Sequence, residues 1–242
     1  MENYLPFEID EMTFDHQLIH YKKPLSTILA CAVKNEYIIQ HLGMLSGIAL
    51  EPTIVTVDAM NLPNALYLNS ETKYPDHFAI LHMGHRHSSI SFIQKKRVHS
   101  IRTLFFGGYH LQQLIKKNLD LTTDQAAEVL HTHGVMELKN KPLYSDDLKK
   151  LSSHLQTGFD SVLNQLKQSL ALHIASNQEE DNEPLSKLYL SGGCSEIKNI
   201  APWLSHHMNI PCEKLNILSH DEDMSEHLQG KETLFNLSLI HI

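Results

Sequence analysis

The longest regular pattern in the sequence is an apolar stripe within residues 145–176. Large apolar side chains recur there at steps of three and four residues, which is the spacing of one face of an α-helix. The stripe comprises Leu148, Leu151, Leu155, Phe159, Val162, Leu163, Leu166, Leu170 and Ile174. Because the stripe is broad and its spacing drifts, it favours a helix packed on a globular core over a coiled coil.

Short β-rich runs predict a sheet for this helix to cover. Residues 78–83 and 188–190 are apolar runs, residues 89–93 alternate polar and apolar side chains, and residues 98–105 predict a further strand. Helices are expected over 58–69, 109–118, from about 124 after a cap at Thr122 or Thr123, and over 197–208. Strands interleaved with helices predict an α/β fold.

The amino-terminal part carries its own pattern. Residues 28–33 predict a strand, and residues 34–44 place apolar side chains on one helical face. Gly47 stands where a helix would end, and residues 48–57 predict a return strand interrupted at Pro52. We therefore expect a β-α-β unit over residues 28–57.

Composition sets the class of protein. With 242 residues, 42% hydrophobic and 20% charged, the chain is long enough for one large domain or two lobes with a substantial core. Its net charge of −8 provides no general basic field, so we expect no nucleic-acid partner. The absence of a long apolar segment or a basic leader predicts a cytoplasmic protein. Three widely spaced cysteines argue against a disulfide framework.

Four segments carry a resemblance to a known family. They are residues 55–66 (VTVDAMNLPNAL), 103–111 (TLFFGGYHL), 121–128 (LTTDQAAE) and 188–197 (LYLSGGCSEI). In this order and spacing they resemble the PilM family of actin-like proteins in type IV pilus assembly, which is related to FtsA and to GspL of type II secretion. The likeness extends over roughly residues 28–216.

The resemblance implies an α/β fold of the actin-like, ribonuclease-H-like type with a small inserted β-α-β subdomain. Residues 1–70 would hold that subdomain and a remnant of the first actin-like lobe. Residues 71–242 would form the second lobe, with a helical subdomain around residues 118–185. Most of the first nucleotide-binding lobe, including its phosphate-binding hairpin, would be missing.

The resemblance also implies a remnant of a nucleotide site. The glycines and serines that would surround a nucleotide are Gly84, Ser88, Ser89, Gly192 and Gly193. His82 stands where the family pattern has a carboxylate, and Mg²⁺ prefers oxygen ligands. We therefore expect no ATPase activity and no bound cofactor, with ATP and magnesium as the alternative.

The function implied is a non-enzymatic cytoplasmic scaffold, peripheral to the inner membrane through its partners. It would bind the cytoplasmic tail of a PilN-like membrane protein and other components of a pilus or secretion platform. A surface left by a lost lobe should be apolar, which predicts self-association. The alternative is a GspL-like, nucleotide-binding actin-like protein of a pilus or type II secretion system.

Two further chemistries are weaker alternatives. The run from His82 to His87 contains three of the chain's 18 histidines and suggests a metal site, although no fourth ligand is evident. Cys194 follows two glycines near a predicted helix start, where a thiolate is stabilised, and Ser195 lies outside any nucleophile elbow. An apolar cysteine in a turn is the simpler interpretation.

Overall fold

The computed structural model describes residues 8–68, 73–176 and 184–215. The chain divides into two compact units, Met1–Val57 and Asp58–Ile242. The predicted boundary after residue 70 differs from this division, because the helix that follows Val57 packs with the second unit. No helix in the described ranges is long and apolar enough to cross a membrane.

The first unit is a β-hairpin followed by a helix. Strand β1 (Met12–Lys22) pairs antiparallel with β2 (Leu25–Lys34), and the register shifts between Leu18 and His20. A single 3-10 turn (η2, Ile9–Glu11) precedes β1. Helix α1 (Asn35–Ser46) follows β2 directly and ends at Gly47, as the sequence predicts.

The predicted β-α-β order is wrong for this unit. Residues 48–57 form no strand in the structure, and the strand that pairs with β2 precedes it in the chain. The apolar run at 28–33 therefore finds its partner through a short hairpin turn. Strands joined by such a turn are antiparallel, whereas a β-α-β unit needs a helical crossover.

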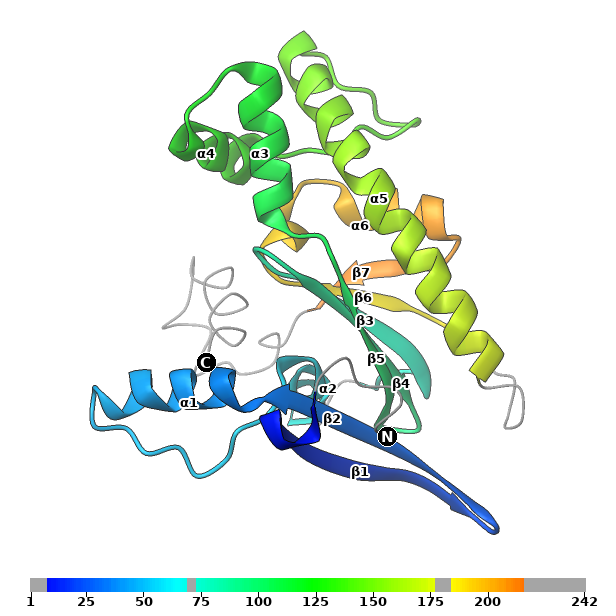
Figure 1. The fold of residues 1–242 in the computed structure, drawn as a ribbon. Coiled ribbons are helices and arrows are strands. Elements are labelled where there is room, and N and C mark those ends of the chain that lie inside the picture. The colour runs from blue at the N-terminus through cyan, green and yellow to red at the C-terminus, as the bar shows by residue number, and fades with distance from the viewer. Residues whose placement is uncertain (1–7, 69–72, 177–183, 216–242) are drawn as a thin grey trace. The chain divides into compact units, whose positions relative to one another are not determined.

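The second unit is built on a five-stranded mixed sheet (Figure 1). Its strands lie in the order β5-β4-β3-β6-β7. Their bounds are β3 His77–Met83, β4 Ser88–Gln94, β5 Arg97–Leu104, β6 Leu188–Ser191 and β7 Cys212–Lys214. The first three form an antiparallel meander, and β6 and β7 extend it in parallel. Strand β7 has no counterpart among the predicted elements.

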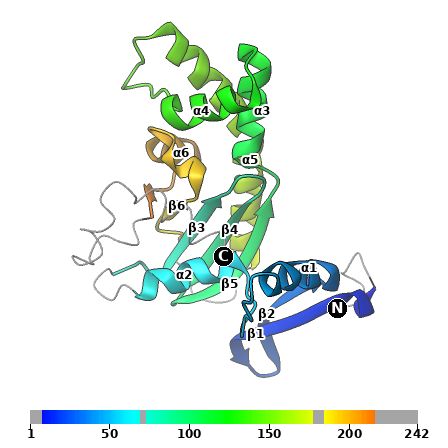
Figure 2. The ribbon, with the colours of Figure 1, turned by 90° about the vertical axis from the view of Figure 1, so that its left-hand side faces the viewer.

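Helices cover both faces of this sheet. Helix α2 (Asp58–Leu68) packs on one face, where Leu62 and Leu66 join a small buried cluster with Phe78 and Tyr189 (Figure 2). The larger core lies on the other face, under α3 (Gly108–Leu119), α5 (Asp146–Ser176) and α6 (Ile200–Met208). Most of the long apolar stripe is thus buried against this core, as predicted, whereas Ile174 near its end is 54% exposed.

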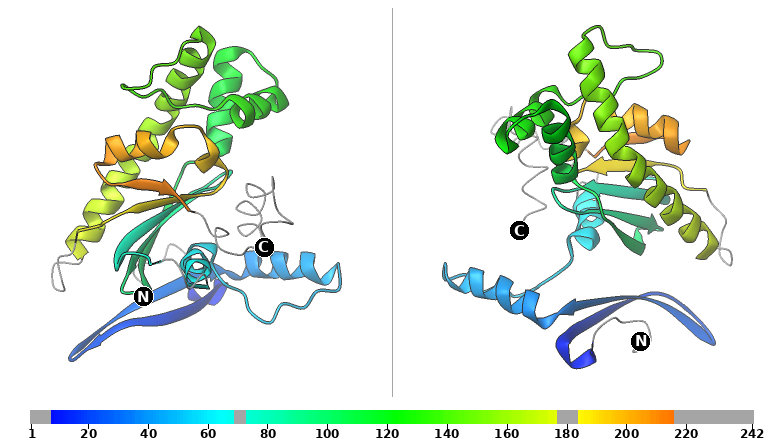
Figure 3. Two further views of the ribbon diagram at one scale, coloured as in Figure 1. Left: turned by 180° about the vertical axis from the view of Figure 1, so that it is seen from behind. Right: turned by 45° about the horizontal axis from the view of Figure 1, so that its top comes forward.

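Helices α3, α4 (Thr123–His133) and the first half of α5 gather beyond one end of the sheet (Figure 3). The sequence predicted a helical subdomain around residues 118–185, whereas α3 of this group already begins at Gly108. Helix α4 begins with a capping box: Gln125 N–H donates to the Thr122 hydroxyl, and Thr122 N–H donates to the Gln125 side chain. The predicted cap at Thr122 is confirmed.

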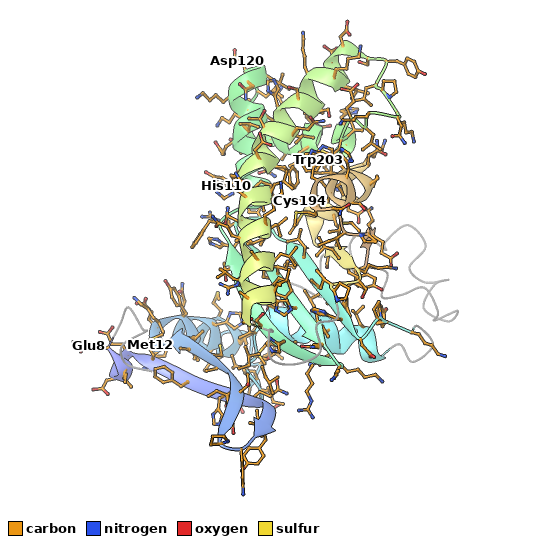
Figure 4. All side chains as sticks on the ribbon, turned by 90° about the vertical axis from the view of Figure 1, so that its right-hand side faces the viewer. Glu8, Met12, His110, Asp120, Cys194 and Trp203 are labelled. Atoms are coloured by element: carbon orange, nitrogen blue, oxygen red, sulfur yellow. The ribbon has the colours of Figure 1, made fainter. Side chains whose placement is uncertain are left out.

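Aromatic side chains join α5 to its neighbours in the core. The ring centroids of Phe159 and Trp203 lie 5.7 Å apart, and those of Phe106 and Phe159 lie 4.9 Å apart. Figure 4 labels Trp203 on α6 beside α5. These contacts hold α6, and the turn that precedes it, against the end of the sheet.

Candidate nucleotide-type cavity and partner surface

A cavity of about 570 Å³ lies where β3 and β6 end. These strands are parallel neighbours, so the turns that follow them meet at the same edge of the sheet. Helices α3 and α4 supply the other walls. The lining residues are His82, Gly84, His85, Gly108, Gln112, Ala127, Glu128, Leu130, His131, Thr132, Gly192, Gly193, Cys194, Glu196 and Ile197.

The turn after β6 is built around glycine. Gly192 has a φ of 85°, and a Cβ placed there would lie 2.8 Å from His82 Cε1 and would also clash with the Met83 carbonyl. A left-handed backbone and this close approach both require glycine. The chain then enters a 3-10 turn (η3, Gly193–Glu196). Helix α6 consequently begins at Ile200, three residues later than predicted.

The turn after β3 is tied to the start of α3. Gly108 N–H donates to the Gly84 carbonyl at 3.0 Å, and Tyr109 N–H donates to the His85 carbonyl at 2.7 Å. The first amides of a helix are otherwise ready donors for a phosphate. Here two of these amides already donate hydrogen bonds to carbonyl groups of the protein.

The five residues expected around a nucleotide separate into two groups. Gly84, Gly192 and Gly193 line the cavity, and their place around a nucleotide stays a prediction. Ser88 and Ser89 are not among the lining residues. Ser88 is buried and its hydroxyl donates to the Phe106 carbonyl at 2.8 Å, while Ser89 lies in β4 opposite His82. The structure thus brings the glycines together and directs Ser88 into a structural hydrogen bond.

His82 does not suit the carboxylate position of a magnesium site. His82 is only 7% exposed and its ring lies against the glycine turn, where it offers nitrogen to a cation that prefers oxygen. No three His, Cys, Asp or Glu side chains in the described ranges are placed to hold a metal ion. His82 thus supplies no oxygen ligand at this edge, where the carboxylates of Glu128 and Glu196 line the cavity.

The histidines of the β3–β4 turn are solvent-exposed and contact aromatic rings. The His85 ring lies edge-on to Tyr109, with centroids 5.8 Å apart, and the His87 ring lies edge-on to Phe105 at 6.2 Å. These two residues belong to the turn itself, outside β3 and β4. The arrangement gives no support to the histidine metal site.

Neither nucleophile candidate is activated. Burial raises the pKa of the Cys194 thiol to about 12, so this side chain is protonated at neutral pH. The Ser195 hydroxyl donates to the Gly192 carbonyl at 2.6 Å and stabilises the turn. The buried thiol of Cys194 agrees with its interpretation as an apolar cysteine in a turn.

Several polar lining residues were not predicted as site residues from the sequence. Gln112 comes from α3, and the exposed Glu128 and His131 come from α4. The segment 121–128 predicted a helix start, but nothing local placed that helix beside a turn more than 60 residues further along the chain. Two carboxylates, Glu128 and Glu196, thus line the cavity, and that of Glu196 is paired with Lys214 at 2.7 Å.

A second histidine cluster lies inside the same unit. The Nε2 atoms of His77 and His173 are 2.9 Å apart, and the His173 ring stacks on Phe92 with centroids 4.0 Å apart. Burial, with the nearby His77, His99 and Arg102, lowers the pKa of His173 to about 3. The cluster joins the end of α5 to the sheet.

The first unit has a surface rich in exposed apolar groups. Within residues 8–57, every side chain that the structure describes is at least partly exposed. Exposed large hydrophobic residues there are Ile9, Leu18, Tyr21, Ile28, Tyr37, Ile39, Met44, Ile48, Leu50, Ile54 and Val55. Exposed apolar surface of this kind is typical of interaction sites.

Comparison with known proteins agrees with this architecture. A family model described as type IV pilus assembly protein PilM matches residues 1–235. A chain in the PilM–PilN type IV pilus biogenesis complex superposes with a TM-score of 0.75 at 22% identity. That alignment covers 98% of this chain and 67% of the other, so this chain spans about two thirds of its length.

More distant neighbours are actin-like. MreB5 of Spiroplasma citri bound to AMPPNP gives a TM-score of 0.57 at 16% identity, over 85% of this chain and 68% of the other. The ADP-bound form gives 0.57 at 15% identity, over 82% and 67%. At these identities the structures establish the actin-like fold alone. No curated protein matches.

Proposed function

Because the chain belongs to the PilM family of type IV pilus assembly proteins, we propose that it is a non-catalytic scaffold of the pilus inner-membrane platform. It binds the amino-terminal cytoplasmic tail of a PilN-like membrane protein and thereby works at the cytoplasmic face of the membrane. The family match over residues 1–235 carries this proposal. The structural likeness to a chain of a PilM–PilN complex supports it.

The tail binds on the first unit. A two-stranded hairpin with one helix buries little surface and is marginal by itself, so its apolar side chains need a cover. Ile39 on α1 is 68% exposed and Ile54 is 79% exposed. An apolar peptide laid on such side chains gains roughly 25 cal/mol per Å² of apolar surface removed from water.

Calorimetric titration with a synthetic peptide tests this proposal. The peptide should correspond to the amino-terminal segment of a PilN-like protein, and the full chain should bind it at one site. Ile39→Ser and Ile54→Ser should each weaken binding several-fold. The matched control is Ile174→Ser, because Ile174 is 54% exposed on α5 of the other unit.

Two results would contradict the assignment. The scaffold proposal fails if the peptide produces no binding heat at protein concentrations well above micromolar. The location on the first unit fails if Ile174→Ser weakens binding as much as Ile39→Ser does. These two outcomes are separable, because the second requires binding by the unmodified chain.

The same surface leads us to propose self-association when the tail is absent. Exposed apolar side chains of two copies cover one another as the concentration rises. Sedimentation velocity should show the average mass increasing with concentration, and saturating peptide should restore the monomer. A monomer at all concentrations, with and without peptide, contradicts this expectation.

A second candidate function is nucleotide binding, and the glycine-lined cavity is the observation that favours it. A cavity of this volume is in the range that holds a small ligand. Under the scaffold proposal, ATP produces no shift in melting temperature and is not hydrolysed. Under the second candidate, ATP stabilises the protein whether magnesium or EDTA is present, because a ligand that binds only the native state raises its stability.

A further inference from the structure

The charges of the second unit are strongly segregated along the chain. Residues 77–119, which contain β3, β4, β5 and α3, include seven Lys and Arg and no Asp or Glu. The whole chain nevertheless carries a net charge of −8. This segment is therefore a cationic region of an acidic protein, and such asymmetry is typical of a surface for an anionic partner.

Aromatic side chains gather at one end of this region. Phe105, directly after β5, is 73% exposed, and Tyr109 at the start of α3 is 39% exposed. The Arg86 guanidinium lies 5.6 Å from the Tyr109 ring centroid, and the His87 ring contacts Phe105. Together with the exposed Arg102 on β5 these residues form what we call the cationic-aromatic patch. His110, labelled in Figure 4, is exposed beside it.

The strand that leads into this patch is an edge strand. Within the described ranges the sheet begins with β5, which pairs with β4 along one side. An edge strand presents backbone N–H and C=O groups that an extended chain can join. Main-chain hydrogen bonds then supply affinity, and side chains beside the strand supply specificity.

We propose that the β5 edge and the cationic-aromatic patch bind an extended acidic peptide of a partner protein by strand addition. The peptide's carboxylates pair with Arg86 and Arg102. An apolar side chain of the peptide packs on Phe105. This surface belongs to the second unit, so the proposal does not depend on where the PilN-like tail binds.

Charge complementarity decides between possible occupants. A second copy that joins edge to edge brings its own Arg102 and the rest of its cationic strand against the same charges, which is unfavourable. An acidic partner removes that repulsion. A membrane surface offers phosphates for the arginines but no backbone to pair with β5.

Two dye-labelled synthetic peptides test the proposal. One is a ten-residue peptide of alternating Glu and Val that ends in Phe, and in the other Lys replaces each Glu. Fluorescence anisotropy should show that the full chain binds the acidic peptide and not the basic one. Binding should weaken at least ten-fold between 0.1 and 0.5 M salt. Hydrogen exchange of the β5 amides should slow in the complex.

Variants locate the site. Arg86→Glu combined with Arg102→Glu should weaken binding of the acidic peptide at least ten-fold, and Phe105→Ser should weaken it several-fold. The control combines Lys117→Glu with Lys139→Glu, which changes the net charge equally at two exposed lysines outside the patch. It should change the dissociation constant less than two-fold.

Several outcomes overturn the proposal. These are equal affinity for both peptides, an equal loss in the control variant, and unchanged exchange of the β5 amides. If phosphatidylglycerol vesicles bind the protein through Arg86 and Arg102 while the acidic peptide does not, the surface is a membrane contact instead. Melting temperatures of all variants within a few degrees of the unmodified chain exclude misfolding as the cause.

Discussion

The Nε2 atoms of His77 and His173 face each other at 2.9 Å in the interior of the second unit, although the residues are 96 positions apart. His77 begins β3 and His173 lies in the last turn of α5. One ring must donate a proton and the other accept it, so the contact needs at least one neutral imidazole. The pair therefore makes the attachment of α5 sensitive to acid.

The first prediction concerns this acid sensitivity. The pKa of His173 falls from 6.5 in the unfolded chain to about 3 in the folded one, so the unfolded state binds more protons at mildly acidic pH. This contribution to stability is complete above pH 6.5 and is lost progressively as the pH falls toward 3. By this linkage the free energy of unfolding should drop by about 2 kcal/mol between pH 8 and pH 5.

Urea denaturation at several pH values checks this expectation. His173→Gln keeps a hydrogen-bonding side chain without a titrating group, so it should flatten the profile between pH 8 and pH 5. His206→Gln, at an exposed position on α6, should leave the slope nearly unchanged. A wild-type slope that survives in His173→Gln would assign the acid sensitivity to other groups.

The second prediction concerns the glycine turn beside the cavity. Gly192→Ala should destabilise the second unit by roughly 1–3 kcal/mol, because its φ of 85° strains any L side chain and the new Cβ meets His82. Gly43 on α1 has open space around it, so Gly43→Ala should be neutral or slightly stabilising. Denaturant titrations would measure the free energy of unfolding of both variants. An unchanged free energy of unfolding in Gly192→Ala would contradict this account of the turn.

The third prediction concerns the cavity wall formed by α4. Thr122→Ala removes the hydroxyl that accepts from Gln125 N–H, and should cost about 1 kcal/mol. Ser153→Ala, at an exposed position within α5, should change stability by less than half that amount. Hydrogen exchange should show faster exchange in the first turn of α4 only in Thr122→Ala.

The fourth prediction concerns thiol reactivity. Burial raises the pKa of both Cys194 and Cys212 to about 12, so little thiolate is present at pH 8. Iodoacetamide should therefore modify Cys31, which is only half-buried, before either of them. Peptide mapping by mass spectrometry gives the order, and urea should make the three rates similar. Rapid labelling of Cys194 in the folded protein would show that the glycine turn opens.

Local sequence patterns predicted most elements of the second unit. The apolar run before Met83, the alternation in β4 and the stripe of α5 each have one dominant period, and the structure follows it. The pattern failed for β1, where Asp15, His16 and Gln17 interrupt the apolar side chains of an exposed hairpin. It also failed at residues 48–57, because a strand needs a neighbouring strand as well as β-branched residues.

Within the candidate site, the sequence predicted only the residues that a particular backbone conformation requires. Gly192 is required by a left-handed turn, and a glycine in that position is visible in the sequence. The direction of Ser88 depends on the pleat of β4, and the place of Glu128 depends on how α4 folds over distant turns. Such long-range placements, like the meeting of His77 and His173, leave no local signal.

The unburied state of the first unit has a thermodynamic consequence. The described part of this hairpin and helix has no interior side chains, so its folding free energy comes from whatever covers it, and the fraction of ordered chains rises with the concentration of the covering molecule. Folding of β1, β2 and α1 and occupancy by a partner then become a single equilibrium. The ordered fraction of the first unit would then depend on how much partner is present.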